Sequence, residues 1–278
     1  MGEFLGYLGP PGTFSEEAAI RYCTGQPLLS KPYFTINQIF SAVENGEVKM
    51  GVVPVENSLE GSVNLTLDLL SGGSQAKVAG ELLLRVQHCL LTRPGEDITQ
   101  IKEIYSHPQA LAQCRTYLYK FIPEAELISM ISTAEAAELV GRSEGKAVIA
   151  SRRAAELYSL DIVRENIQDE PSNITRFLLL AMEDAPWTGL DKTSLLIGLD
   201  DRPGSLHAAL GVFACHDLNL TKIESRPLRG TLGKYKFFLD LEGHRKDLKV
   251  SRALEEVQEK ALCLKILGSY PVARQTLL

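Results

Sequence analysis

FLGYLGPPGTFSEEAAIRYC, residues 4–23, decides the first unit of the fold. FLGYLG has the composition of a short buried strand, and the Gly-Pro-Pro-Gly turn at residues 9–12 ends it. Thr13 with Glu16 three residues later is the pattern of a capping box, which predicts a helix through SEEAAIRYC. A strand followed at once by a helix is the repeating unit of α/β proteins.

The same alternation continues to about residue 180. Thr35 and Gln38 open a second predicted helix, and further strands are expected at residues 50–56, 102–107, 126–131 and 146–151, with helices after the last three. Residues 76–93 are too long for one ordinary buried strand and lack a helical stripe, which predicts a crossing from one lobe to another. Residues 172–183 can return as a strand. We expect a two-lobed α/β region with mostly parallel strands and a cleft.

The C-terminal part has a different pattern. The turn-rich segment 183–192 contains the only Trp and predicts a domain boundary. Beyond it we expect strands at 193–199, 218–227, 235–242 and 262–270, with residues 229–233 joining the middle two. Apolar stripes predict the two helices, at Leu206, Leu210 and Phe213 and at Val250, Leu254, Val257 and Ala261. The order βαββαβ is ferredoxin-like.

Composition excludes several classes of protein. With 278 residues, 45% hydrophobic and 23% charged, the chain is long enough for two globular domains. Its net charge of −6 argues against nucleic acid as a partner. Residues 192–278 carry 14 Lys and Arg against 10 Asp and Glu, or +4, which leaves −10 for residues 1–191. This charge step favours two separate modules.

Further patterns limit the chemistry. The 5 cysteines form no C-x-x-C pair, and the histidines form no metal-binding motif. No apolar run approaches the length of a membrane span and the N-terminus lacks a signal-peptide pattern, so we expect a cytoplasmic protein without membrane or export. No G-x-S-x-G, P-loop or dinucleotide motif is present, so we expect no metal and no cofactor.

Neutral polar side chains remain as candidates. Asn57, Ser58, Ser106, Gln113 and Thr175 lie at predicted strand ends, where open α/β sheets place their ligands. Each could instead cap a helix or shape a turn, but their common placement favours a binding cleft. The loop at residues 9–13 is either an anion-binding loop or a simple tight turn. His107 is either an acid or a helix-start residue, and the second is favoured.

Several strings carry a resemblance to a known family. They are GPPGTFSEEAA (9–19), PVENSLEGSV (54–63), SHPQALAQC (106–114), STAEAA (132–137), NITRF (173–177), DRPGSL (201–206) and NLTKIESRP (219–227). Together they resemble monofunctional prephenate dehydratases over essentially the whole chain. The resemblance implies a type II periplasmic-binding-protein-like catalytic region at 1–185, with lobe one at about 1–80 plus 173–185 and lobe two at about 81–172. A regulatory ACT domain follows at 192–278.

The resemblance also implies an activity. The family converts prephenate to phenylpyruvate, CO2 and water in L-phenylalanine biosynthesis, without a cofactor. Because the ring carboxylate leaves as CO2, no general base is needed, and the departing hydroxyl alone requires help. The family's catalytic threonine corresponds to Thr175. The substrate-binding residues that the resemblance implies are Thr13, Glu56, Asn57, Ser58, Ser106, Gln113 and Arg176.

Two of these residues are harder to place. A regular strand points Thr175 and Arg176 to opposite faces, so Arg176 reaches the cleft as a carboxylate clamp only if the chain is irregular there. Glu56 would repel a dianionic substrate and is expected to orient a neighbour instead.

For the ACT domain, the resemblance implies feedback inhibition by L-phenylalanine. The expected effector-binding residues, at an interface between two ACT domains, are Gly204, Ser205, Leu206, Asn219 and Leu220. The family usually has Ala where this chain has Ser205. Glu224–Pro227 match the second ACT string, which could also be a strand end with a local ion pair. A homodimer or homotetramer is expected. An arogenate dehydratase and a non-catalytic two-lobed amino-acid-sensing protein remain alternatives.

Overall fold

The computed structural model describes residues 3–227 and 235–273, and the chain divides into two compact units. The first contains the described residues up to 66 together with 82–177, and the second contains 67–81 together with the described residues from 178 onward. Strands β5 (Lys77–Arg85) and β11 (Ile174–Ala181) each run through both units. The predicted domain bounds at residues 185 and 192 stay a prediction.

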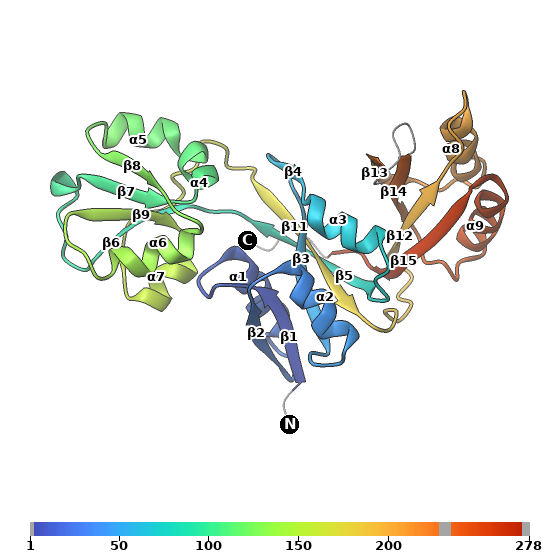
Figure 1. Ribbon diagram of the computed structural model, residues 1–278, viewed down its shortest axis with the longest axis horizontal. Helices are drawn as coiled ribbons and strands as arrows, with labels where there is room; N and C mark the ends of the chain where they lie inside the picture. Colours follow the sequence, from blue (N-terminus) through green and yellow to red (C-terminus); the bar gives the residue numbers. More distant parts are fainter. Residues whose placement is uncertain (1–2, 228–234, 274–278) are drawn as a thin grey trace. The chain divides into compact units, whose positions relative to one another are not determined.

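The first sheet has the strand order β2-β1-β3-β11-β5 (Figure 1). It contains β1 (Glu3–Leu8), β2 (Leu28–Tyr33) and β3 (Met50–Asn57), and the short β4 (Gly61–Ser62) pairs with β3. β1 pairs with β2 and β3 in parallel, and the pairing of the two predicted strands β1 and β3 agrees with the expected parallel arrangement. The helices of this lobe are α1 (Phe14–Cys23), α2 (Ile36–Glu44) and α3 (Asn64–Ser71).

The two predicted capping boxes of this lobe differ. Thr35 and Gln38 form the complete reciprocal pair at the start of α2. At α1, Thr13 accepts from the Glu16 N–H, but the Glu16 carboxylate accepts from the Gly12 N–H and from Arg153. Glu16 therefore fastens the 9–12 turn to the neighbouring lobe instead of closing the box.

The second lobe is built on a five-stranded sheet of order β10-β6-β9-β7-β8. Its strands are β6 (Cys89–Thr92), β7 (Glu103–Ser106), β8 (Glu126–Ser129), β9 (Lys146–Ala150) and β10 (Asp161–Arg164). The helices are α4 (Pro108–Gln113), α5 (Arg115–Phe121), α6 (Thr133–Val140) and α7 (Arg152–Tyr158), with one 3-10 turn at Ile98–Gln100. One apolar cluster lies with α6 and α7 and another with α4 and α5. The single helix expected over 108–121 is broken at Cys114, whose backbone leaves the helical region.

Two chain segments connect the lobes. β5 ends at Arg85 and β6 begins at Cys89, so residues 86–88 form the first crossing, as predicted for the long segment 76–93. The second crossing runs back into β11 beside the first. The Val86 N–H donates to the Asn173 carbonyl at 2.8 Å, and the Ile167 N–H donates to the His88 carbonyl at 3.0 Å. The expected two-lobed α/β fold is confirmed, although β6 pairs with β9 and β10 in antiparallel rather than parallel fashion. The likeness to periplasmic binding proteins stays a prediction.

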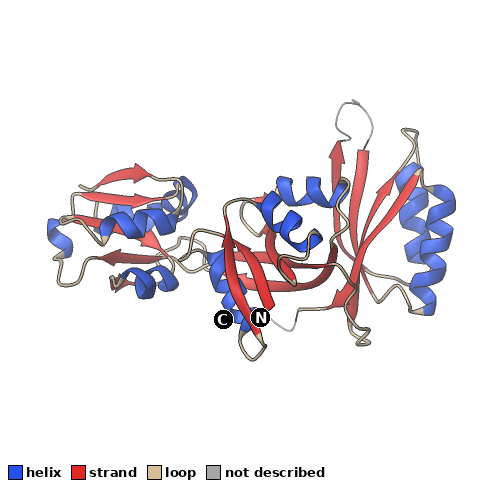
Figure 2. Ribbon diagram, turned by 60° about the horizontal axis from the view of Figure 1, so that its bottom comes forward, coloured by secondary structure: helices blue, strands red, loops and turns tan. Residues whose placement is uncertain are grey.

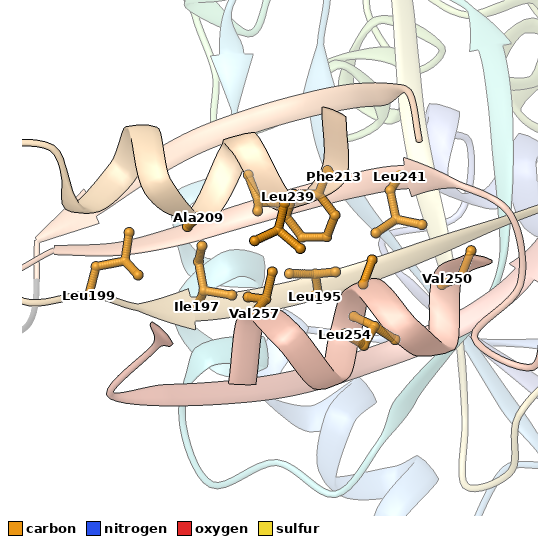
Figure 3. Close-up of a cluster of buried hydrophobic side chains, with 12 residues drawn as sticks. Leu195, Ile197, Leu199, Ala209, Phe213, Leu239, Leu241, Val250, Leu254 and Val257 are labelled. Carbon is orange, nitrogen blue, oxygen red and sulfur yellow. The ribbon is translucent and has the colours of Figure 1, made fainter. Parts of the chain in front are cut away.

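The C-terminal unit contains β12 (Asp191–Gly198), α8 (Ser205–Cys215), β13 (Leu220–Pro227), β14 (Tyr235–Glu242), α9 (Leu248–Lys260) and β15 (Cys263–Pro271). The antiparallel sheet has the order β13-β14-β12-β15, and both helices cover one face of it (Figure 2). The predicted stripes face inward: Phe213 of α8 and Val250, Leu254 and Val257 of α9 pack on Leu195, Ile197, Leu239 and Leu241 (Figure 3). The ferredoxin-like prediction is confirmed. The predicted connection at 229–233 lies outside the described residues.

Among the described residues, the strands and helices that were not predicted are β2, β4, α3 and β10, together with the 3-10 turn at Ile98–Gln100. β2 contains Pro32, which reads as a turn residue, yet the strand lies at the edge of the sheet, where a missing N–H is tolerated. β4 has only 2 residues and forms through its partner β3. No helix in the described ranges is long and apolar enough to cross a membrane.

Candidate active site

A cavity of about 740 Å³ lies within the first unit and is lined by both lobes. Lobe one contributes the residues around the 9–13 turn and the end of β3, and lobe two contributes the first residues of α4 and α6. Four of the predicted site residues line it: Thr13, Asn57, Gln113 and Thr175. The other four, Glu56, Ser58, Ser106 and Arg176, are not among the lining residues.

Asn57 has a fixed orientation at the tip of β3. Its Oδ1 accepts from the backbone N–H groups of Leu59 and Glu60, at 3.0 and 3.1 Å. A backbone N–H can only donate, so the Nδ2 of Asn57 points the other way. It donates to Asn173 Oδ1 at 2.7 Å and to Thr175 Oγ1 at 2.9 Å. The Thr175 hydroxyl therefore accepts from Asn57, and its own proton is available to a further acceptor.

Gln113 connects this group to both crossings. Its Oε1 accepts from Asn173 Nδ2 and lies 3.0 Å from His88 Nε2, while its Nε2 donates to Glu60 Oε1 at 3.1 Å. Besides the exposed Glu60, the network brings together three residues that were predicted for the site and two, His88 and Asn173, that were not. Both additions are almost fully buried, at 3% and 1% exposure.

His88 is held neutral by its surroundings. Burial lowers the pKa of its imidazole, and the hydrogen bond with Gln113 offsets part of that effect. Phe14 packs edge-on against its ring, with centroids 5.6 Å apart. His88 stands in the predicted crossing segment, and that position between two apolar strands was the one sequence signal for it.

Ser58 and Ser106 have structural contacts. The Ser58 Oγ accepts from the Ile174 N–H and contacts the Ser172 carbonyl, which joins the end of β3 to the start of β11. Ser106 is completely buried, and its hydroxyl donates to the Ile149 carbonyl. His107 caps α4 through Nδ1, the favoured of its two interpretations.

Glu56 and Arg176 lie beside each other. The Arg176 Nη1 is 3.9 Å from the Glu56 Oε2, and the Arg176 side chain is only 12% exposed. Thr175 and Arg176 are consecutive residues of a continuous strand, whose side chains point to opposite faces. Thr175 faces the cavity, so the condition set for an Arg176 clamp, an irregular chain, is not met.

The lining is nearly without positive charge. Among the described residues around the cavity there is no Lys or Arg, while Glu135 and Glu138 of α6 are present. The starts of α1 and α6 border the cavity through Thr13, Phe14, Ser132 and Thr133. Helix starts carry partial positive charge that favours anions. No group of three His, Cys, Asp or Glu side chains that could hold a metal occurs in the part of the chain that the structure describes.

The expected effector residues lie in the second unit. Gly204, with φ of 83°, precedes α8, and the Ser205 hydroxyl is buried without a hydrogen-bond partner. Leu206 and Leu220 pack against the apolar core of that unit. Asn219 borders a cavity of about 440 Å³ and donates to Glu242. The roles of these five residues stay predictions.

Known proteins match both units. Residues 5–185 match the prephenate dehydratase family and residues 193–259 match the ACT domain. A Lactococcus lactis protein named prephenate dehydratase is 42% identical over 275 residues, covering 96% of this chain and 97% of that one. A prephenate dehydratase from Arthrobacter aurescens, solved in complex with L-Phe, is 34% identical, with a TM-score of 0.88 over 99% of this chain and 92% of that chain.

A solved structure described as GqqA, a novel type of quorum quenching acylase, is 32% identical with a TM-score of 0.87, over 98% of both chains. The prephenate dehydratase match covers the cleft and its network, and the ACT match runs from β12 to α9 and ends before β15. The chain belongs to the prephenate dehydratase family and carries an ACT domain.

Proposed function

We propose that this chain converts prephenate to phenylpyruvate, CO2 and water in the cavity lined by Thr175, and that L-phenylalanine inhibits it through the ACT domain. One observation carries the site assignment: the Thr175 hydroxyl faces the cavity and accepts from Asn57. A hydroxyl held as an acceptor on one side presents its proton on the other. That proton is the hydrogen bond that a departing hydroxyl requires.

The reaction needs little from the protein. The bond between the ring and its carboxylate breaks as CO2 leaves, the electron pair enters the ring, and the C–O bond breaks. The hydroxyl leaves with the pair of that bond and takes up one proton from solvent to become water. Negative charge develops on the leaving oxygen, and a hydrogen bond donated by Thr175 stabilises it. Asn57 strengthens that donor because a hydroxyl that accepts a hydrogen bond becomes a better donor.

The uncharged lining fits this chemistry. A Lys or Arg on the ring carboxylate would stabilise the group that must be lost, and would bind the substrate without lowering the barrier. We infer that the starts of α1 and α6, with Thr13 at the first, receive the carboxylates. Gln113 and Asn57 then orient the ring from the opposite side of the cavity.

The residues outside the lining have supporting roles in this proposal. Ser58 fixes the start of β11, next to Thr175, and Ser106 fixes the end of β7 to β9. Arg176 and Glu56 compensate each other's charge on the other face of β11. We therefore assign the pyruvyl carboxylate to the helix starts rather than to Arg176.

Acylase activity, which names one of the solved relatives, has less support in this cleft. Acyl transfer by a serine needs a base within hydrogen-bond reach of its hydroxyl. Of the serines in the lining, Ser132 caps α6, and the two lining histidines bond to Gln113 and to the Gln109 N–H. Among the described lining residues no serine is hydrogen-bonded to a histidine.

The test is steady-state kinetics of the purified chain with prephenate and with arogenate, each with and without L-phenylalanine. We expect the higher kcat/KM with prephenate, and inhibition by L-phenylalanine. A preference for arogenate would make the chain an arogenate dehydratase. Binding of L-phenylalanine without turnover of either compound would make it an amino-acid-sensing protein.

Assembly and location complete the proposal. We propose a homodimer or homotetramer in the cytoplasm, with L-phenylalanine bound near Gly204, Ser205 and Asn219 where two ACT domains meet. Light scattering after size-exclusion chromatography measures the mass in solution. A monomer at micromolar concentration, with or without L-phenylalanine, would contradict the assembly.

A further inference from the structure

The donor and acceptor atoms of the cleft network can be assigned one after another, starting from Asn57, whose orientation two backbone N–H groups fix. The Leu59 and Glu60 N–H groups require the Asn57 Oδ1 as their acceptor, so the Asn57 Nδ2 donates. Asn173 therefore presents Oδ1 to Asn57 and Nδ2 to Gln113. Both Oε1 contacts of Gln113 are then with donors, which removes the usual ambiguity of amide orientation.

The same reasoning shows which nitrogen of the His88 ring carries the proton. Because Gln113 Oε1 can only accept, His88 Nε2, at 3.0 Å, must carry the proton. The Nδ1 atom is then unprotonated, and it is buried without a hydrogen-bond partner. A doubly protonated ring would place a positive charge and a second unpaired donor in this position, which burial disfavours.

We propose that His88 is a positioning residue for the dehydration: its Nε2–H holds the Gln113 amide, and through it the Asn173 amide that accepts from Asn57. The Leu59 and Glu60 N–H groups set the orientation of Asn57 at one end of the network, and His88 keeps the Thr175 hydroxyl in place from the other end. This rests on the proposed role of Thr175. In these hydrogen bonds His88 and Asn173 each donate to Gln113, and Asn57 donates both to Asn173 and to Thr175. The other nitrogen-bearing side chains of the network, Asn57, Asn173 and Gln113, are amides, which can exchange donor and acceptor by a half-turn of the amide group. The His88 imidazole has no amide group and cannot do so.

The placement of His88 supports this role. Its N–H is held by Gln168 Oε1 at 2.9 Å and its carbonyl by the Ile167 N–H at 3.0 Å, so both crossings hold its backbone. Gln113 comes from lobe two and Asn57 from lobe one. His88 thus holds the Gln113 amide at the crossings that join the two lobes.

The test compares two substitutions. His88→Gln retains an N–H donor near the position of Nε2, and His88→Leu removes it. We expect His88→Leu to lower kcat by about 10- to 100-fold, the cost of a misplaced reacting group, with KM changed less than about 3-fold. His88→Gln should keep kcat within about 3-fold of wild type. Equal losses in both variants, or a normal kcat in a folded His88→Leu, would overturn the proposal.

A double-mutant cycle separates positioning from general packing. If His88 acts through the Thr175 hydroxyl, His88→Leu should cost little further kcat in a Thr175→Ala background. A full further loss there would contradict the route. Tyr105→Phe is the control, because it removes a hydrogen bond to Glu103 that lies outside this network and outside the cavity lining; it should leave kcat unchanged.

A measurement on the wild-type chain covers the case in which His88→Leu does not fold. The ¹⁵N chemical shifts of the His88 ring should report protonation at Nε2 and none at Nδ1. A proton on Nδ1 would overturn the assignment. If the wild-type chain does not turn over prephenate, the proposed function itself fails; if it does and His88→Leu is unaffected, only this inference fails.

Discussion

The cleft and the C-terminal unit hold their polar groups by different means. In the cleft the contacts run between amides, a hydroxyl and a neutral imidazole, as in the bonds from Asn57 to Thr175 and from Asn173 to Gln113. In the C-terminal unit, charges hold the segment 67–81. Lys265 donates to the carbonyls of Leu70, Gly72 and Ser74. Arg226 pairs with Asp68, and Lys192 with Glu81.

The difference follows from what each region does. An amide network has a direction, because each donor requires an acceptor, and it can therefore aim one hydroxyl proton. A lysine ammonium attracts any nearby carbonyl or carboxylate and suits the attachment of two chain segments. A charge of that kind in the cleft would bind the carboxylate that the reaction must release.

The largest effect is expected for the hydroxyl itself. In the proposed mechanism Thr175→Ala removes the proton that would stabilise the leaving group, so kcat should fall by about 100-fold or more, the range of a lost acid–base contribution. KM should change little, because the rest of the cleft is unaltered. Steady-state kinetics and circular dichroism of the variant check this; a near-normal kcat would remove Thr175 from the catalytic role.

The second largest effect is expected for a substitution that reverses the direction of the hydrogen bond between Asn57 and Thr175. Asn57→Asp keeps the size of the side chain but replaces the Nδ2 donor with an oxygen, so the Thr175 hydroxyl would donate to the new carboxylate instead of the substrate. We expect a fall in kcat of about 10- to 100-fold. The thermal midpoint serves as the control, and a variant with normal kcat would show that direction does not matter here.

A loss of stability is expected when Lys265 no longer holds the segment 67–81. Lys265→Met removes a donor to three carbonyls, and the free energy of unfolding should fall by about 1–2 kcal/mol, a charged hydrogen bond reduced by partial exposure. Lys260→Met is the matched control, because its pair with Glu256 is exposed and should contribute under about 0.5 kcal/mol. Urea unfolding of both variants measures the difference; equal changes would contradict the attachment.

The smallest effect is expected in the pH dependence of stability. The folded-state pKa of His88 lies below its ordinary value of 6.5, so the unfolded chain takes up a proton first as the pH falls. The stability that the neutral ring contributes is present above pH 6.5 and is lost below it. Unfolding free energies at about pH 7.5 and about pH 5 should differ less in His88→Gln than in wild type. An equal difference in both would show that His88 does not titrate as burial requires.

Much of the fold could be predicted, and the misses have physical causes. Buried apolar runs and helix caps gave the main strands and helices, because these signals are local. β2, β4, α3 and β10 were missed because neighbouring strands and helices stabilise them more than their own sequence does. The helix over 108–121 was predicted as continuous because the contacts at its break come from Asp169, more than fifty residues away: its N–H donates to the Gln113 carbonyl and its carboxylate accepts from the Thr116 N–H.

The residues of the candidate site also divide into those that could be predicted and those that could not. Asn57 is the last residue of β3, and its position at the cleft could be predicted from the strand end. Gln113 instead ends α4 and Thr175 is the second residue of β11, so the prediction that both lie at the ends of strands did not hold, although both line the cavity. Asn173 belongs to a recognised string, but its bonds to Asn57 and Gln113 depend on chain segments far apart in sequence. His88 lies in the short crossing at residues 86–88, Val-Gln-His, and belongs to no polar motif of the sequence.

By itself, the sequence determined the order of the elements, the two-part layout, the uncharged character of the candidate residues and the alternation that separates Thr175 from Arg176. These properties are local, or repeat with a fixed period along the chain. The tertiary structure alone decided which residues meet at the cleft, in which direction each amide donates, and that His88 belongs to them. Direction in a network depends on every partner at once, and only the folded chain brings Asn57, Asn173, Gln113 and His88 within hydrogen-bond distance.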